Sequence, residues 1–215
     1  MIDRHLTAVG SIMITAMTLF GPGALRAQTD PSAHQHMLPT THLHTSMIDV
    51  RLPQVVLVRE DRKKVQLVAE LNDGRPVILN FIFTTCPGIC PIMSHTFSHL
   101  QDLLHIESTK IHMVSISIDP EQDTPARLRD YATQFAARKQ WQYYTGSVEA
   151  SVAVQQAFGV YGGDKMRHDP VTFMRAAPNS SWIRIDGFGS AEQLAGEFTH
   201  LVDTAAASEV ATASR

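Results

Sequence analysis

Cys86 and Cys90 are the only two cysteines in the 215 residues of this chain, and three residues separate them. They stand in the sequence Cys-Pro-Gly-Ile-Cys-Pro, directly after an apolar run at residues 77–83 that predicts a buried strand. Two thiols in this position can form a disulfide, attack one in another molecule, or bind a soft metal ion. Because so short a loop gains little closure entropy, a purely structural disulfide is the weakest of these interpretations.

Pro91 indicates where the helix after the cysteines begins. Proline is favoured at the first helical position and disrupts a helix further in. We therefore predict that Cys90 is the N-cap residue and that Cys86 lies in the preceding loop. The partial positive charge of a helix N-terminus lowers the pKa of a nearby thiol, so we expect a raised thiolate fraction.

His168 is the candidate for a third metal ligand, since two sulfurs rarely complete a site alone. It follows a glycine-rich turn and precedes a predicted strand, in a loop that would face the cysteines. A surface or core histidine is the alternative at this position. His95 and His99 lie off the apolar stripe of their predicted helix, so we expect them to be solvated. His112 and His200 receive no role.

Strands and helices alternate along the chain, and a hairpin and a last helix close it. Apolar and β-branched runs predict strands at residues 55–58, 65–68, 77–83, 111–118, 141–144, 171–174 and 182–185. Helices are predicted after Cys90, from Pro125 with Thr124 as N-cap, over residues 148–158, and from a capping box at residues 190–193 to about Ala206. This order predicts an α/β protein with a thioredoxin-like fold. Its central mixed β-sheet is flanked by helices and carries an N-terminal β-hairpin extension.

The ends of the chain differ in composition from this domain, which we place at residues 49–206. Residues 1–27 have the pattern of a signal peptide, which is either cleaved after Ala27 or retained as a membrane anchor. The protein is thus expected to be exported to the periplasm, soluble if cleaved and anchored in the inner membrane if not. Residues 207–215 are expected to be a frayed tail. A net charge of −3 without a basic run argues against nucleic acid as a partner.

Residues 28–48 form a polar segment rich in histidine and methionine, and no apolar periodicity is visible in it. We expect this segment to be flexible. Its histidines are His34, His36, His42 and His44. They either capture copper weakly and pass it inward or belong to a solvated linker of biased composition.

Three motifs give the chain a family resemblance. Residues 86–91 fit the pattern C-P-x-x-C-P, residues 117–125 read Ser-Ile-Asp-Pro-Glu-Gln-Asp-Thr-Pro, and residues 158–161 read Phe-Gly-Val-Tyr. Together with His168, they make the chain resemble the Sco/SenC family of copper-binding thioredoxin-like proteins over roughly residues 50–205. From residues 119–125 alone we expect only a turn and a helix cap.

The resemblance implies that Cys86, Cys90 and His168 bind copper, as Cu(I) or Cu(II). It implies a metallochaperone that delivers copper to, or prepares the thiols of, the dinuclear copper site of cytochrome c oxidase. The implied partners are the copper-site subunit of that oxidase and another copper chaperone, and keeping the thiols reduced requires a thiol reductase. The chain departs from the family at Arg167, where an aspartate is common, and at Gly88, where an acidic residue is common.

The alternative function is a thiol–disulfide oxidoreductase that acts on exported protein thiols. The more exposed Cys86 would attack a target disulfide, and Cys90 would resolve the mixed disulfide. A peroxidase is disfavoured, because the threonine-to-cysteine spacing of peroxiredoxin-like sites is missing before Cys86. The chain is therefore expected to act as a metallochaperone rather than as an enzyme.

Overall fold

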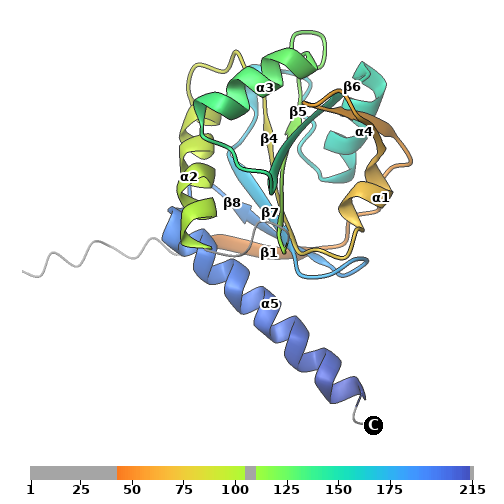
Figure 1. The fold of residues 1–215 in the computed structure, drawn as a ribbon, viewed down its shortest axis with the longest axis vertical. Helices are drawn as coiled ribbons and strands as arrows, with labels where there is room; N and C mark the ends of the chain where they lie inside the picture. The colour runs from red at the N-terminus through yellow and green to blue at the C-terminus, as the bar shows by residue number, and fades with distance from the viewer. Residues whose placement is uncertain (1–42, 105–109, 214–215) are drawn as a thin grey trace, which may run out of the picture. The chain divides into compact units, whose positions relative to one another are not determined.

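The computed structural model describes residues 43–104 and 110–213, all of which belong to one compact unit, Thr41–Arg215. Within these residues a single mixed sheet has the strand order β1-β8-β7-β4-β5-β6-β2-β3 (Figure 1). The strands are β1 (His44–Ile48), β2 (Val56–Arg59), β3 (Lys64–Gln66), β4 (Val77–Ile82), β5 (His112–Ser117), β6 (Trp141–Gly146), β7 (Val171–Arg175) and β8 (Trp182–Asp186).

The centre of the sheet is the parallel pair β4 and β5. All six residues of each strand are buried, as expected for strands covered on both faces. Val77 pairs with His112 and Ile82 with Ser117, so both strands end at the same edge of the sheet. The loops that follow them must therefore lie side by side. We call this edge the thiol end, because the cysteines follow β4 there, and the opposite edge, where β5 begins at His112, the histidine end.

Helices cover both faces of the sheet. The helices α2, α3 and α5 lie on one face, and α1 and α4 lie on the other (Figure 1). Their bounds are α1 (Leu67–Leu71), α2 (Ile89–Leu103), α3 (Pro125–Gln134), α4 (Val148–Ala157) and α5 (Ala191–Ala213), and a short 3-10 helix, η1, spans Lys165–Arg167.

Each face of the sheet has its own apolar core. The core under α2, α3 and α5 contains three buried side chains of α2, one of α3 and one of α5: Met93, Phe97, Leu100, Leu128 and Phe198. Burying a side chain of this size contributes roughly 1.5–3 kcal/mol to stability. The mixed sheet with helices on both faces confirms the predicted fold class, and the antiparallel pair β2 and β3 is the predicted N-terminal hairpin.

Two predicted helix starts are confirmed in detail. Thr124 is the N-cap of α3 and accepts a hydrogen bond from the backbone N–H of Arg127, with Pro125 at the start of the helix. Before α5, Ser190 Oγ accepts from the Gln193 N–H, and Gln193 Oε1 accepts from the Ser190 N–H. Such caps satisfy backbone groups that have no partner within the helix.

The sequence analysis was wrong about three segments. Residues 28–48 were predicted to be flexible, but His44–Ile48 is strand β1, paired antiparallel with β8. Backbone hydrogen bonds to the open edge of β8 form that strand, so no apolar alternation is needed. Residues 67–68, predicted as strand, begin α1. The last helix was expected to end near Ala206 but continues to Ala213, because alanine-rich sequence without glycine or proline favours helix.

The predicted signal segment at residues 1–27 and the histidines His34, His36 and His42 lie outside the described residues. Within the described ranges, no helix combines the length and the apolar character needed to cross a bilayer.

Candidate functional site

The two cysteines lie at the thiol end of the sheet, Cys86 in the loop after β4 and Cys90 in the first turn of α2. The predicted N-cap is wrong by two residues. Gly88 is the N-cap, and the helix starts at Ile89, so Cys90 is its second residue. Pro91 is the third residue of the helix, where it is tolerated because the first N–H groups of a helix have no internal partner.

The two sulfurs differ in exposure. Both cysteines are free thiols; Cys86 is half-buried, and Cys90 is 0% exposed. The backbone N–H of Phe83 donates to Cys90 Sγ at 3.4 Å, and the Cys90 N–H donates to Cys86 Sγ at 3.4 Å. The prediction that Cys86 is the more accessible sulfur is therefore confirmed, and a backbone donor faces each sulfur.

His168 approaches the cysteines from the other side of the site. It follows η1 directly, and its Nε2 atom lies 3.5 Å from Cys90 Sγ. The imidazole packs edge-on against Phe83, with 6.1 Å between the ring centroids. The expectation that the loop before β7 faces the cysteines is confirmed.

Burial sets the protonation of two of these groups. Burial raises the pKa of the Cys90 thiol above its ordinary range, and the adjacent Cys86 and Asp123 act in the same direction. The expected lowering of the thiol pKa by the helix N-terminus is therefore wrong for Cys90, because desolvation outweighs the helix field. Burial lowers the pKa of His168, which keeps its imidazole neutral near pH 7.

Asp123 holds the cysteine loop to the end of β5. Its carboxylate is fully buried and accepts hydrogen bonds from the Thr84 N–H at 3.2 Å, from Thr84 Oγ1 at 2.6 Å and from Ser117 Oγ at 2.6 Å. The sequence analysis missed this role and assigned residues 119–125 only a turn and a cap. A signal was present, because an acid after one parallel strand lies beside the loop that follows its neighbour.

Lys165 joins the loop that carries His168 to the loop after β5. Its Nζ atom donates to Asp119 Oδ2 at 2.6 Å and lies 5.7 Å from the centroid of the Phe83 ring. This contact places η1, and with it His168, over the thiol end. Arg167, a departure from the family pattern, is exposed and pairs with Asp164 at 3.8 Å.

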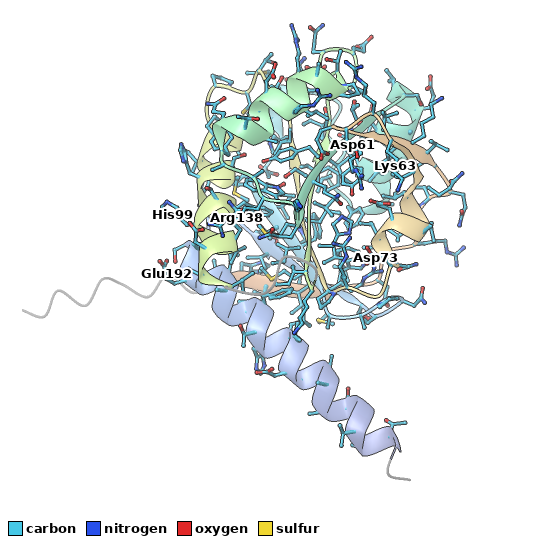
Figure 2. The ribbon with its side chains drawn as sticks, viewed as in Figure 1. Asp61, Lys63, Asp73, His99, Arg138 and Glu192 are labelled. Atoms are coloured by element: carbon cyan, nitrogen blue, oxygen red, sulfur yellow. The ribbon has the colours of Figure 1, made fainter. Side chains whose placement is uncertain are left out.

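His95, His99 and His112 have other surroundings. His95 and His99 on α2 are exposed, as predicted, and Figure 2 shows His99 on the outside of the domain beside Glu192 of α5. His112 is fully buried, and its Nε2 atom lies 2.9 Å from the Tyr144 hydroxyl at the histidine end of the sheet. It is thus held by a hydrogen bond within the core.

The donor set of the site is two thiols and one neutral imidazole. Thiolate sulfur and imidazole nitrogen together suit copper(I), zinc and other soft or borderline cations. Cys90 and His168 are already within 3.5 Å of each other. Across residues 43–104 and 110–213, no three histidine, cysteine or acidic side chains are close enough together to hold a metal ion as they stand. The arrangement can also perform thiol–disulfide exchange, since one sulfur is accessible and the second is close behind it in the chain.

Comparison with known proteins gives one family. The SCO1/SenC family model matches residues 57–202. A SCO1 protein homolog from Bacillus subtilis is 33% identical over 94 residues, which are 43% of this chain and 48% of that protein. The match thus spans about half the length of that relative.

Solved structures share the fold. The copper-bound ScoI of Arabidopsis thaliana superposes with a TM-score of 0.60 at 24% identity, covering 69% of this chain and 96% of that one. BsSco, a member of the Sco family of cytochrome c oxidase assembly proteins in which a disulfide switch was identified, superposes with a TM-score of 0.60 at 22% identity. That likeness covers 74% of this chain and 96% of BsSco. At these identities the structures show a common fold.

Proposed function

Because the chain belongs to the SCO1/SenC family, we propose that it is a copper-binding metallochaperone whose cargo is held by Cys86, Cys90 and His168. The observation that carries this proposal is the approach of His168 Nε2 to 3.5 Å from Cys90 Sγ, from a segment 78 residues further along the chain. This contact places a buried thiol and a neutral imidazole where one ion could bind both. The donor types suit copper(I).

Loading the site with copper requires the thiols to lose their protons. Burial favours the neutral thiol at Cys90 and the neutral imidazole at His168. The imidazole is therefore already in its ligand form, whereas the cation must take the place of a thiol proton. Copper binding should accordingly release protons and weaken as the pH falls.

Release of copper follows from the unequal burial of the donors. Cys86 and His168 are half-buried, whereas Cys90 is 0% exposed. An acceptor thiolate or imidazole can reach the copper from the side of the two accessible donors and displace them one at a time. Cys90 would then be the last donor to release the copper ion. In this order the ion keeps at least one protein donor at every stage of the transfer.

The proposed acceptor is the dinuclear copper site of cytochrome c oxidase, through delivery of copper or reduction of its thiols. The sequence motifs and the likeness to BsSco support this assignment. The signal pattern at residues 1–27 supports an exported protein. In an oxidising compartment a thiol reductase is needed to keep the pair reduced, and a second copper chaperone is the proposed source of the cargo.

The second candidate function is thiol–disulfide exchange, and the difference in cysteine exposure favours it. The Cys86 thiolate would attack a target disulfide and release one target thiolate. Cys90, after losing its proton, would attack the Cys86 sulfur, release the second target thiolate and leave a Cys86–Cys90 disulfide. Two electrons pass from the pair to the target, and a dithiol reductase would return them.

Replacing the third ligand separates the two functions. The reduced full chain and its His168→Ala variant are titrated with copper(I) against a competing chelator, and both are assayed for reduction of a model disulfide. We expect the variant to lose tight copper binding and to keep thiol exchange. Copper binding as tight in the variant as in the parent would contradict the three-ligand site. Loss of exchange with copper binding intact would favour the second function.

A further inference from the structure

A groove of about 430 Å³ opens beside His168. Three segments line it: the loop that follows β5, the first two turns of α4, and the loop that leads from α4 to His168. A hollow of this volume is in the range that accommodates several side chains or a small ligand. We call it the His168 groove, since His168 forms the wall nearest the thiols.

The walls of the His168 groove carry apolar side chains that remain accessible. Val148 at the start of α4 is 45% exposed, and Tyr161 in the loop after α4 is 49% exposed. Ile118, Val152 and Val160 add further apolar lining. Single exposed apolar residues are ordinary on a protein surface, but a set gathered in a concave surface beside a reactive centre indicates a contact site.

The charges that line the groove are mainly negative. Three carboxylates, those of Asp119, Glu121 and Asp164, face one lysine, Lys165. Lys165 is bound to Asp119, and Asp164 is paired with Arg167. Glu121 forms no ion pair with any residue in the described part of the chain, although its charge, like that of Asp119, raises the pKa of Lys165. The groove therefore has an excess of negative charge, with one accessible carboxylate ready for an incoming cation.

We propose that the His168 groove docks a segment of an acceptor protein that presents an apolar side chain next to a lysine or arginine. This inference rests on the proposed function, because an acceptor must reach the copper ligands. The apolar side chain would cover Val148 and Tyr161, and the cation would lie against Glu121. Electrostatic complementarity of this kind accelerates association and selects the partner.

The position of the groove gives docking a consequence for copper transfer. His168 lines both the groove and the copper site. A segment seated in the groove would bring the residues that follow it to the accessible side of the ligands. A second copy of this chain is a poorer occupant, because its own groove would bring the same excess of carboxylates.

The test uses two synthetic peptides, acetyl-Lys-Leu-Leu-Lys-amide and acetyl-Glu-Leu-Leu-Glu-amide, which differ only in the sign of their charge. Neither contains cysteine, histidine or methionine, so neither competes for copper. Each is titrated into the reduced, ¹⁵N-labelled full chain while amide chemical shifts are recorded. We expect saturable shifts at Glu121, Val148 and Tyr161 with the lysine peptide, and binding at least about threefold weaker with the glutamate peptide.

Two variants complete the test. Glu121→Gln should weaken binding of the lysine peptide by about threefold, whereas Glu197→Gln on α5 should leave it unchanged. Equal binding of the two peptides, shifts centred elsewhere, or no shifts at millimolar peptide would overturn the docking proposal. Shifts at the groove that depend on protein concentration alone would identify a second copy as its occupant and would also overturn it.

Copper binding is measured on the same samples, which separates this inference from the one on which it rests. Glu121→Gln should bind one copper ion as tightly as the parent. A parent chain that binds the lysine peptide in the groove but binds no copper would contradict the proposed metallochaperone function and would support the docking proposal. A parent that binds copper but neither peptide would contradict the groove alone.

Discussion

Two histidines lie near a polar partner at opposite ends of the same sheet, and their surroundings differ. At the histidine end, His112 is fully buried, 2.9 Å from the Tyr144 hydroxyl, which in turn donates to Glu70 at 2.9 Å. At the thiol end, His168 is half-buried, and its Nε2 atom lies 3.5 Å from the sulfur of Cys90. The first histidine is fully enclosed and is hydrogen-bonded through Nε2, whereas no hydrogen bond reaches its Nδ1 atom within the described residues. The second has a sulfur atom as its neighbour and access to solvent.

This difference separates a role in stability from a role in function. A buried polar group that is hydrogen-bonded is costly to disturb, because its partners lose their bonds without gaining water. A half-buried imidazole beside a thiol loses little when its loop moves, so it can exchange partners. We therefore expect substitutions at the histidine end to change folding and substitutions at the thiol end to change copper binding.

The largest expected effect on copper affinity is at the thiol end. His168→Ala removes a donor atom and should raise the dissociation constant for copper(I) more than about 100-fold, since disturbing even the outer shell of a metal site costs 10–100-fold. The free energy of unfolding should change little. Chelator competition and urea unfolding of the same variant measure the two quantities. A variant that has a lower free energy of unfolding but binds copper as tightly as the parent would contradict this account, because His168 would then act in stability and not in copper binding.

The matched substitution at the other end should have the opposite result. His112→Ala leaves a cavity and deprives the Tyr144 hydroxyl of a partner, so the free energy of unfolding should fall by about 3–4 kcal/mol. The copper affinity of the folded fraction should equal that of the parent. Urea unfolding provides the first value and copper competition at low urea the second. A drop in copper affinity would show that the two ends are coupled.

Burial lowers the pKa of both histidines, but the larger pH dependence of stability should come from His112 at the histidine end. Burial, with a smaller effect of Arg75, lowers the pKa of His112 to about 4 from its ordinary value near 6.5. The unfolded chain therefore binds a proton between these values that the folded protein does not, so stability is lost as the pH falls from about 6.5 to about 4. The loss should be on the order of 3 kcal/mol.

The control for that measurement is the His112→Ala variant, because other charged groups also face His112. Asp73, labelled in Figure 2, lies 3.8 Å from His112 Nδ1, and its negative charge opposes the lowering of the histidine pKa. The slope of unfolding free energy against pH between 6.5 and 4 should be shallower in His112→Ala than in the parent. Equal slopes would mean that other groups produce the acid sensitivity.

The smallest effect is expected where the two loops of the thiol end are joined. Asp123→Asn keeps the shape of the side chain but turns an amide N–H₂ toward Thr84 or Ser117, both of which donate to the parent carboxylate. The free energy of unfolding should fall by about 2 kcal/mol. Hydrogen exchange of the Thr84 amide should increase at the same time. Unchanged exchange at Thr84 would show that Asp123 does not hold the cysteine loop.

Local sequence patterns predicted most of the fold. The apolar runs of β4 and β5 and the caps at Thr124 and Ser190 are local signals that need no partner to be recognised. Strand β1 was missed because pairing with the distant β8 forms it, and its own residues show no alternation. The helix start at Ile89 was missed because proline is tolerated throughout the first turn of a helix.

The candidate site was predicted as a set of residue types but not as an environment. Cys86, Cys90 and His168 were named from motif and spacing, and the structure brings His168 to Cys90. The raised pKa of the Cys90 thiol could not be predicted, because burial depends on the packing of α2 and Phe83 around the sulfur. The anchoring by Asp123 likewise depends on the parallel register of β4 and β5.

The central claim is that Cys86, Cys90 and His168 bind one copper ion together, and X-ray absorption at the copper edge tests it most directly. The reduced full chain is loaded with one equivalent of copper(I), and the His168→Ala variant is measured beside it. The account predicts a shell of two sulfur atoms and one nitrogen atom in the parent, with the nitrogen lost in the variant. A shell without sulfur, or a nitrogen contribution that His168→Ala leaves unchanged, would contradict it.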